Sequence, residues 1–250
     1  MKIISFLSFS LCGFVAFGQQ KLIIKENDTM RTEIEQLSNS VNSAFNDYAP
    51  VVTADGTELF FTSRRPLSEK EKKKNIEAKE NIYRSTADET SGQWKDAEAL
   101  PPTINSPGRF NSNIAISNDG QRLLIYQDDQ YGNGDIFESY LKGETWSTPT
   151  PISKVINSEA HESSASIAPD GRTIYYVSER AGGIGKRDIW KCTKDENGNW
   201  GLPENLGSVV NTKSEEESVF IHPDGVTLYF SSKGHNSLGG YDVFKSTLVN

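Results

Sequence analysis

Four Asp-Gly pairs recur along this chain at intervals of about 50 residues, and this repeat constrains the fold more than any other feature. The pairs are Asp55-Gly56, Asp119-Gly120, Asp170-Gly171 and Asp224-Gly225. Each pair is followed by an apolar run, then by a polar loop and a second short apolar stretch. Asp-Gly favours tight hairpins because Gly adopts the positive φ that such turns need. Each copy is therefore predicted to contain antiparallel strands around its Asp-Gly hairpin.

Three copies continue into a second motif, in which a Trp is followed by an aliphatic residue and then by an Asn at fixed spacing. The members are Trp94, Leu100 and Asn105; Trp146, Ile152 and Asn157; and Trp200, Leu206 and Asn211. The run after each hairpin, such as Leu59-Phe60-Phe61, is apolar at successive positions, so both faces of that strand are predicted to be buried between neighbouring sheets. These features predict an all-β fold, a β-propeller of four-stranded antiparallel blades with the first strands lining the axis.

The domain organisation follows from the repeat. Residues 44–250 are predicted to form the propeller, with blades at about 44–106, 107–158, 159–212 and 213–250. Residues 1–18 are predicted to be a cleavable signal peptide, because Lys2 precedes an apolar run and small residues lie before a cleavage point between Gly18 and Gln19. The mature chain is then left with one thiol, Cys192, which falls where the other copies have Ser and is predicted to be a small buried strand residue.

Residues 19–43 are predicted to supply a closing strand. Leu37 and Asn42 reproduce the aliphatic–Asn spacing, whereas the fourth copy stops before its Trp strand. Propellers hide their last sheet edge with a strand from the other terminus, so Glu33 to Val41 is expected to pair beside Tyr241 to Ser246. An open arc with missing blades is the alternative.

The stretch from Gly198 to Thr212 and the stretch from Glu216 to Phe244 resemble the WD40-like repeats of the TolB-like propeller group. They are most similar to the version in envelope proteins of Bacteroides-type bacteria, which often carry a peptidoglycan-binding OmpA-like domain. The resemblance implies a propeller and a place in the cell envelope. It does not transfer peptidoglycan binding, because this sequence has no OmpA-like domain.

The composition and motifs argue against several functions. With 34 acidic and 26 basic side chains, the net charge is −8, which disfavours binding to nucleic acid or to anionic membranes. The histidines are His161, His222 and His235, and none has a motif that predicts a nucleophile–base pair. No G-x-S-x-G elbow is present. The glycine run at 182–186 precedes a short strand and lacks the Ser or Thr of a phosphate-binding loop. We therefore predict that the chain is not an enzyme and needs no cofactor or metal.

A channel-rim binding site is predicted from the repeat positions. The residues that begin the first strands are Asp47, Asn111, Glu162 and Glu216, with Glu217 beside the last. The strands returning from the hairpins would bring Arg64, Arg65, Arg180 and Lys233 to the same rim. Two interpretations stay open. In the first, the acidic residues stabilise the rim by pairing with these bases or with backbone N–H groups. In the second, they form a polar ring that holds a ligand or a cation, with calcium favoured over zinc because only oxygen ligands are present.

The function that fits best is an exported, non-catalytic binding or scaffold module, periplasmic or associated with the outer membrane, without a transmembrane segment in the mature chain. Its partner would be an envelope protein, a peptide or a glycan, with an outer-membrane or peptidoglycan-associated complex as its setting. One alternative is a hydrolase or lyase acting on polysaccharide. Another is that the sequence is a fragment of a larger OmpA-like multidomain envelope protein.

Overall fold

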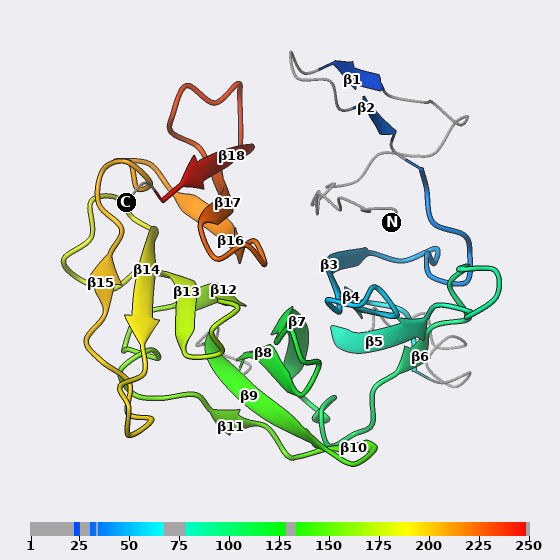
Figure 1. Cartoon of the computed structure of the whole chain (residues 1–250). Helices are drawn as coiled ribbons and strands as arrows, with labels where there is room; N and C mark the ends of the chain where they lie inside the picture. Colours follow the sequence, from blue (N-terminus) through cyan, green and yellow to red (C-terminus); the bar gives the residue numbers. More distant parts are fainter. Residues whose placement is uncertain (1–22, 26–30, 34, 68–78, 129–133, 249–250) are drawn as a thin grey trace.

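The computed structural model describes residues 23–25, 31–33, 35–67, 79–128 and 134–248. The regular secondary structure in these ranges consists of β-strands. The described residues contain no helix long and apolar enough to cross a membrane. Figure 1 shows four antiparallel sheets arranged around a common centre, which confirms the predicted all-β propeller arrangement of four blades. The predicted signal peptide, residues 1–18, lies outside the described residues.

Each sheet begins at the centre and is built outward in chain order. The first contains β3 (Asp47–Val52), β4 (Glu58–Ser63), β5 (Asn81–Thr86) and β6 (Glu98–Ala99). The second contains β7 (Phe110–Ile116), β8 (Arg122–Asp128), β9 (Gly134–Lys142), β10 (Thr145–Trp146) and β11 (Thr150–Pro151). The third contains β12 (Glu162–Ile167), β13 (Thr173–Ser178), β14 (Asp188–Thr193) and β15 (Glu204–Asn205). The fourth contains β16 (Glu216–Ile221), β17 (Thr227–Ser232) and β18 (Asp242–Thr247). A separate hairpin pairs β1 (Ile23–Lys25) with β2 (Arg31–Glu33).

The Asp-Gly hairpins join the first and second strands of every sheet, as predicted. In the first, Gly56 has φ 74° and the Asp55 carboxylate accepts the backbone N–H of Thr57 at 3.0 Å. Asp119, Asp170 and Asp224 accept the backbone N–H two residues further on in the same way. The Asp side chain therefore fixes each turn by an internal hydrogen bond.

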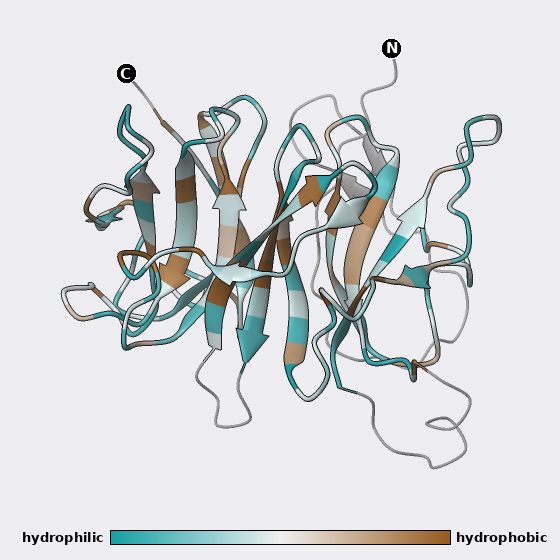
Figure 2. Ribbon diagram, turned by 90° about the horizontal axis from the view of Figure 1, so that it is seen from below, coloured by the Kyte–Doolittle hydropathy of each residue, from teal (hydrophilic) through white to brown (hydrophobic). Residues whose placement is uncertain are grey.

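The second strands supply the core in both directions. Phe60 packs between the first and second sheets, whereas its neighbours Leu59 and Phe61 face the opposite side of the first sheet. The same alternation holds in the third sheet, where Tyr176 faces the second sheet and Val177 faces the fourth. Figure 2 shows hydrophobic residues concentrated along the strands. Sheet-on-sheet packing on both faces explains why these strands are apolar at successive positions.

In each of the first three sheets the fourth strand is broken into two pieces. The Trp residues form the first piece: Trp94 and Trp200 make isolated bridges to the end of the third strand, and Trp146 lies in β10. The second piece is a two-residue strand, β6, β11 or β15, that pairs with the middle of the third strand. The Trp positions are equivalent in the three copies, as expected.

The Asn of each repeat replaces the missing part of the fourth strand. The Asn105 carboxamide accepts the backbone N–H of Ile82 at 2.8 Å and donates to the carbonyl of Ile82 at 3.0 Å. Asn157 does the same to Ile136, and Asn211 to Ile189. A side-chain amide can imitate a strand because it carries one acceptor and two donors. We call this arrangement the amide clasp.

The predicted closing strand is not among the pairings of the described residues. There, β18 pairs only with β17, and residues 35–43 lie in turns and irregular structure against the first sheet. Val41 is buried with Leu59 and Phe61, and the backbone N–H of Ala97 donates to Ser40 at 2.9 Å. The side chains of Leu37 and Val41 thus cover the first sheet. This packing explains why the segment keeps the repeat spacing although it does not lie beside the fourth sheet.

Candidate functional site

The strand starts predicted as a channel rim are brought to the same end of the molecule, but most of their side chains turn into the individual blades. The Glu162 carboxylate is fully buried and accepts the Ser158 N–H at 3.0 Å, the Ser158 hydroxyl at 2.7 Å and the Ser178 hydroxyl at 2.6 Å. Every one of these partners belongs to the approach to the third sheet or to that sheet itself. Glu162 therefore fastens its own blade.

The same carboxylate latch recurs in two other sheets. Glu216 is fully buried and accepts the N–H and the hydroxyl of Thr212, at 3.0 and 2.7 Å, and the hydroxyl of Ser232 at 2.7 Å. Asp47 accepts the N–H and hydroxyl of Ser43, at 2.6 and 2.8 Å. Although partial burial raises the pKa of Asp47, the bonds from Arg65 and the serines outweigh it and hold that pKa below its usual value.

In the second sheet an amide pair replaces the carboxylate. The side chain of Gln127 donates to the carboxamide of Asn111 at 2.9 Å, and both residues are buried. The four equivalent positions are thus three carboxylates and one amide, each engaged within its own blade.

Two of the predicted bases complete these latches. Arg65 donates to Asp47 at 2.8 Å and to the carbonyl of Val41 at 2.6 Å. Arg180 lies 3.5 Å from Glu162, donates to the carbonyls of Val155 and Ile156, and lies over the rings of Tyr176 and Trp190. These contacts place both guanidinium groups against the blade interior.

The fourth sheet uses a histidine in place of the latch arginine. His235 Nε2 lies 2.8 Å from the carbonyl of Val210, and its ring lies 5.2 Å from that of Phe244. Sequence reasoning treated His235 only as a possible catalytic residue and missed this role. The alignment of the repeats could have predicted this role, because Val210 corresponds to Ile156, whose carbonyl accepts a hydrogen bond from Arg180.

The remaining predicted residues are Glu217, Arg64 and Lys233, and all three lie in partly exposed ion pairs. Lys233 pairs with Glu215 at 2.5 Å. Arg187 donates to Glu217 at 2.6 Å and to Glu179 at 2.8 Å, and so joins the start of β16 to the end of β13. Ser163 on β12 also donates to Glu217. Partial burial lowers the pKa of Arg187, but its two carboxylate partners outweigh this and raise the pKa above its ordinary value.

On the opposite side of the axis, Arg64 pairs with Glu80 at 2.8 Å. Burial and a hydrogen bond with Glu80 raise the pKa of Tyr48. Burial, followed by the charge of Asp128, raises the pKa of Tyr126, whose ring meets His161 edge-on at 5.7 Å between centroids. Both phenols therefore stay neutral donors at physiological pH.

These partly exposed residues form the surface that we call the axial rim: Tyr48, Glu80, Tyr126, Glu179, Arg187 and Glu217. Hydrogen bonds join neighbouring sheets at this surface: Ser163 on β12 donates to Glu217 on β16, and the backbone N–H of Asn111 on β7 donates to the carbonyl of Glu80, which precedes β5. Sequence reasoning found Glu217 in this set but missed the other five residues. The rim combines hydrogen-bond donors and acceptors of both signs with two aromatic faces, a set of groups suited to polar ligands.

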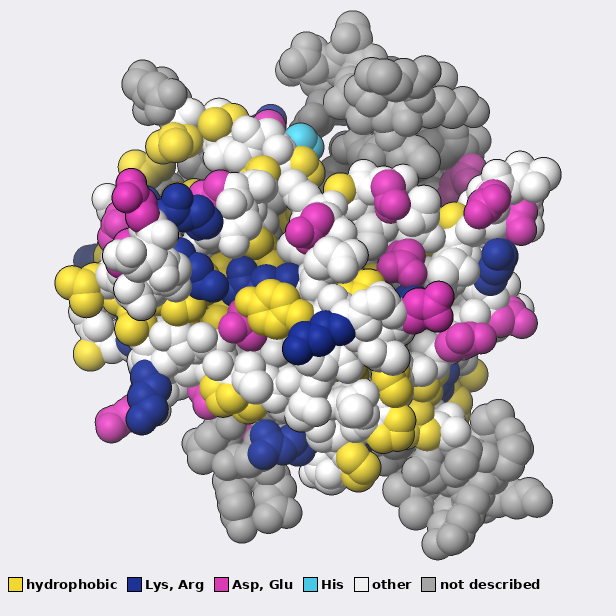
Figure 3. Space-filling model, turned by 60° about the horizontal axis from the view of Figure 1, so that its bottom comes forward, with side chains coloured by type: hydrophobic (Ala, Val, Ile, Leu, Met, Phe, Trp, Pro, Cys, Tyr) yellow, Lys and Arg dark blue, Asp and Glu magenta, His cyan; other side chains and the backbone are white. Residues whose placement is uncertain are grey.

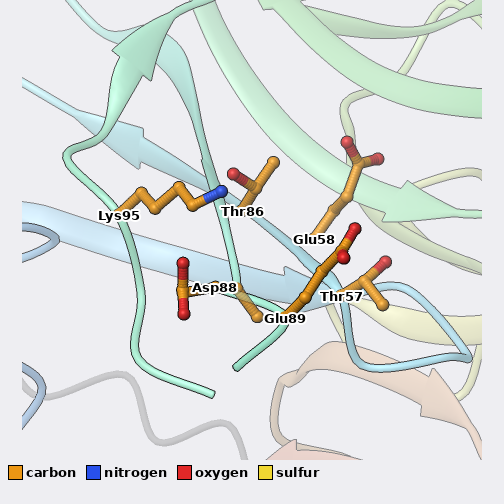
Figure 4. Close-up of a pocket in the computed structure, with 7 residues that line it drawn as sticks. Thr57, Glu58, Thr86, Asp88, Glu89 and Lys95 are labelled. Carbon is orange, nitrogen blue, oxygen red and sulfur yellow. The ribbon is translucent and has the colours of Figure 1, made fainter. Parts of the chain in front are cut away.

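A shallow hollow of about 510 Å³ lies elsewhere, at the hairpin end of the first sheet. Figure 4 shows Glu58, Glu89 and Lys95 around it, with Asp88 beside them. Asp88 accepts the backbone N–H groups of Thr90 and Ser91, so this carboxylate serves its turn. On the face shown in Figure 3, acidic and basic side chains are interspersed among apolar ones.

The described residues contain no group of three or more His, Cys, Asp or Glu side chains placed to hold a metal ion. His222 accepts the backbone N–H of Asp224 at 3.1 Å and so belongs to the fourth Asp-Gly turn. Cys192 is buried and donates to the carbonyl of Gly201 at 3.0 Å, as expected for a small strand residue.

No family model matches the sequence, and no curated protein matches it either. The fold is similar to solved structures. TolB from Acinetobacter baumannii is 15% identical over 88% of this chain and 44% of its own, with a TM-score of 0.52. A protein assigned as TolB from Agrobacterium tumefaciens is 18% identical over 82% of this chain and 59% of its own, with a TM-score of 0.53. A periplasmic gluconolactonase from Pseudomonas aeruginosa is 12% identical over 80% of this chain and 57% of its own, with a TM-score of 0.45. The chain spans about half the length of the TolB structures, and this likeness shows the propeller fold alone.

Proposed function

We propose that this chain is an exported, non-catalytic binding module of the bacterial cell envelope, and that its axial rim binds a protein, peptide or glycan partner. The signal-peptide pattern and the resemblance of the repeats to envelope propellers support the location. An association with the outer membrane or with peptidoglycan belongs to the same proposal.

The observation that carries the binding role is the contrast between two sets of polar groups at the same end of the sheets. The latch carboxylates Glu162 and Glu216 are fully buried and saturated with hydrogen bonds. The rim residues Arg187 and Glu217 keep 28% and 20% of their side chains exposed. Charged groups that are fixed by partners and still reach solvent present a preorganised surface, which reduces the cost of ordering side chains on binding.

The test compares three purified chains: the native protein, the double variant Arg187→Ala, Glu217→Ala, and the control Leu202→Ala. Removing both members leaves neither charge of this pair without its partner. Glu179, which also loses its bond from Arg187, keeps 29% of its side chain exposed to solvent. Leu202 is a matched exposed residue away from the rim, at 85% exposure. Envelope extract and arrays of envelope glycans and peptides would first identify a partner, and calorimetry would then measure its affinity for the three chains.

We expect the rim variant to bind the partner at least about tenfold more weakly, a loss of about 1.4 kcal/mol, and the Leu202 control to bind as the native chain does. Equal affinity of all three chains would contradict the assignment of the rim. Turnover of a glycan or ester substrate that one carboxylate substitution abolishes would contradict the non-catalytic role.

A further inference from the structure

One edge and one face of the fourth sheet are uncovered in the described part of the chain. β18 has β17 as its only partner there, so the outer edge of β18 carries free backbone groups. Val243 on β18 is 39% exposed, whereas Ile82, Ile136 and Ile189, which occupy its position in the other sheets, are 0% exposed. Phe220 on the same sheet is 42% exposed and lies 6.4 Å from the ring of Tyr229.

The third sheet shows what normally covers this position. Asn211 clasps the backbone of Ile189, and the N–H of Leu206 donates to the same carbonyl at 3.2 Å. Two residues after Ile189 on the same strand, Lys191 forms an ion pair with Glu204 at 3.1 Å. The covering segment is thus residues 204–211, which provides a carboxylate, an aliphatic residue and a clasping amide in fixed order.

Residues 35–42 repeat that covering segment, and although Leu37 and Val41 pack on the first sheet, the segment clasps no third strand among the described residues. Glu35, Leu37 and Asn42 have the same spacing as Glu204, Leu206 and Asn211. Asn42 makes the local bond of the motif, donating to the carbonyl of Leu37 at 2.6 Å. Among the described residues, however, no third-strand backbone lies beside its carboxamide, and Glu35 is exposed without an ion pair.

The two incomplete ends do not meet within one copy. No strand of the first sheet contacts a strand of the fourth in the described part of the chain. Figure 1 shows β3 apart from β16, β17 and β18, with no strand label between them. Unpaired sheet edges recruit further strands because their backbone groups are already aligned for pairing.

We propose that a second copy of this chain docks head to tail, with its residues 35–42 completing the fourth sheet of the first copy. Asn42 of one copy would clasp the backbone of Val243 in the other, and Glu35 would pair with Lys245, the counterpart of Lys191. The apolar face around Val243 and Phe220 would be covered in the same contact. Such a contact is heterologous, so it builds a closed ring if the rotation closes and a filament if it does not.

The test is a charge exchange in the full mature chain, followed by size-exclusion chromatography with light scattering. Glu35 and Lys245 are both exposed, so the single variants Glu35→Lys and Lys245→Glu are expected to fold, and their melting temperatures would verify this. Each single variant places like charges across the contact and is expected to weaken self-association at least about tenfold. The doubly exchanged chain, Glu35→Lys, Lys245→Glu, restores opposite charges and is expected to regain it.

Val243→Arg is expected to abolish association, since it puts a charge into the covered apolar face, whereas Leu202→Asp is the control that leaves association unchanged. A native chain that stays monomeric up to about 100 µM would overturn the proposal, because a specific interface of this kind associates well below that concentration. Association that is indifferent to Lys245→Glu, or that the double exchange fails to restore, would overturn it as well. These results are independent of partner binding at the axial rim.

Discussion

The double variant Glu162→Gln, Glu216→Gln separates a fastening role of the latch carboxylates from a ligand-binding role. Each carboxylate is fully buried and accepts one backbone N–H and two hydroxyl groups within 3.0 Å. Glutamine fills the same space but replaces one acceptor oxygen by an NH2 group, which faces a donor. We expect the loss of at least one charge-assisted hydrogen bond per site, about 1.5–3 kcal/mol.

The two latches belong to different sheets and share no partner, so their effects are expected to add to about 5 kcal/mol. For a chain of this size, that corresponds to a fall in melting temperature of about 10–20 °C. Urea unfolding followed by tryptophan fluorescence would measure the loss, with the exposed turn residue variant Glu196→Gln as the control. The reasoning is refuted if the double variant loses less than about 1 kcal/mol, a value typical of surface substitutions, or if it keeps its stability while partner binding disappears.

Three further predictions concern the turns, the amide clasp and the thiol. Hydrogen bonds from the Val226 and Thr227 N–H groups hold the pKa of Asp224 at about 2, below the usual 3.8. The contribution of this carboxylate to stability is therefore present above pH 3.8 and is lost as the pH falls towards 2. Between pH 5 and 2, the urea midpoint should fall less steeply for Asp224→Asn than for the native chain. Asn157→Ala strips the buried Ile136 backbone of both clasp bonds and should cost about 2–4 kcal/mol, with faster amide hydrogen exchange at Ile136 as the signature that a remote defect would not give. Burial raises the pKa of the Cys192 thiol, so a thiol reagent should label the native chain only at the rate at which it unfolds, and rapid labelling would contradict the buried assignment.

The sequence repeat was enough to locate the sheets. The Asp-Gly pairs identified the four hairpins because positive φ at Gly and the Asp carboxylate determine that turn locally. The successive apolar residues of Leu59-Phe60-Phe61 identified strands covered on both faces. The turn depends on residues that are adjacent in the chain, and the run of apolar residues depends only on burial of both strand faces. A repeat pattern therefore reveals both features.

The side-chain directions at the rim could not be predicted in the same way. Each first strand contains a shift in its register, and Ala49 and Ser218 adopt positive φ at equivalent positions in two of them. Such bulges break the strict alternation of faces, so counting back from the hairpin located the strand start but not the direction of Glu162 or Glu216. Only the fold shows that Glu216 turns inward while the adjacent Glu217 reaches the axis.

The closing strand stays a prediction, because the described residues do not pair it with β18. Leu37 and Asn42 carry the repeat spacing, and spacing alone does not say which sheet edge receives the segment. The apolar contacts of Val41 with Leu59 and Phe61 hold it on the first sheet, at a distance from β18 that depends on the curvature of the whole arrangement. Curvature arises from packing between sheets and has no local sequence signature.

The most direct measurement of the central claim is photo-crosslinking in the intact envelope. A photoreactive amino acid in place of Tyr126 would report what contacts the axial rim, and the same group in place of Leu202 would report the outer surface. The account predicts that one discrete partner, protein or glycan, is captured from position 126 and not from position 202. Capture from position 202 alone, or the same products from both positions, would contradict a binding site at the axial rim.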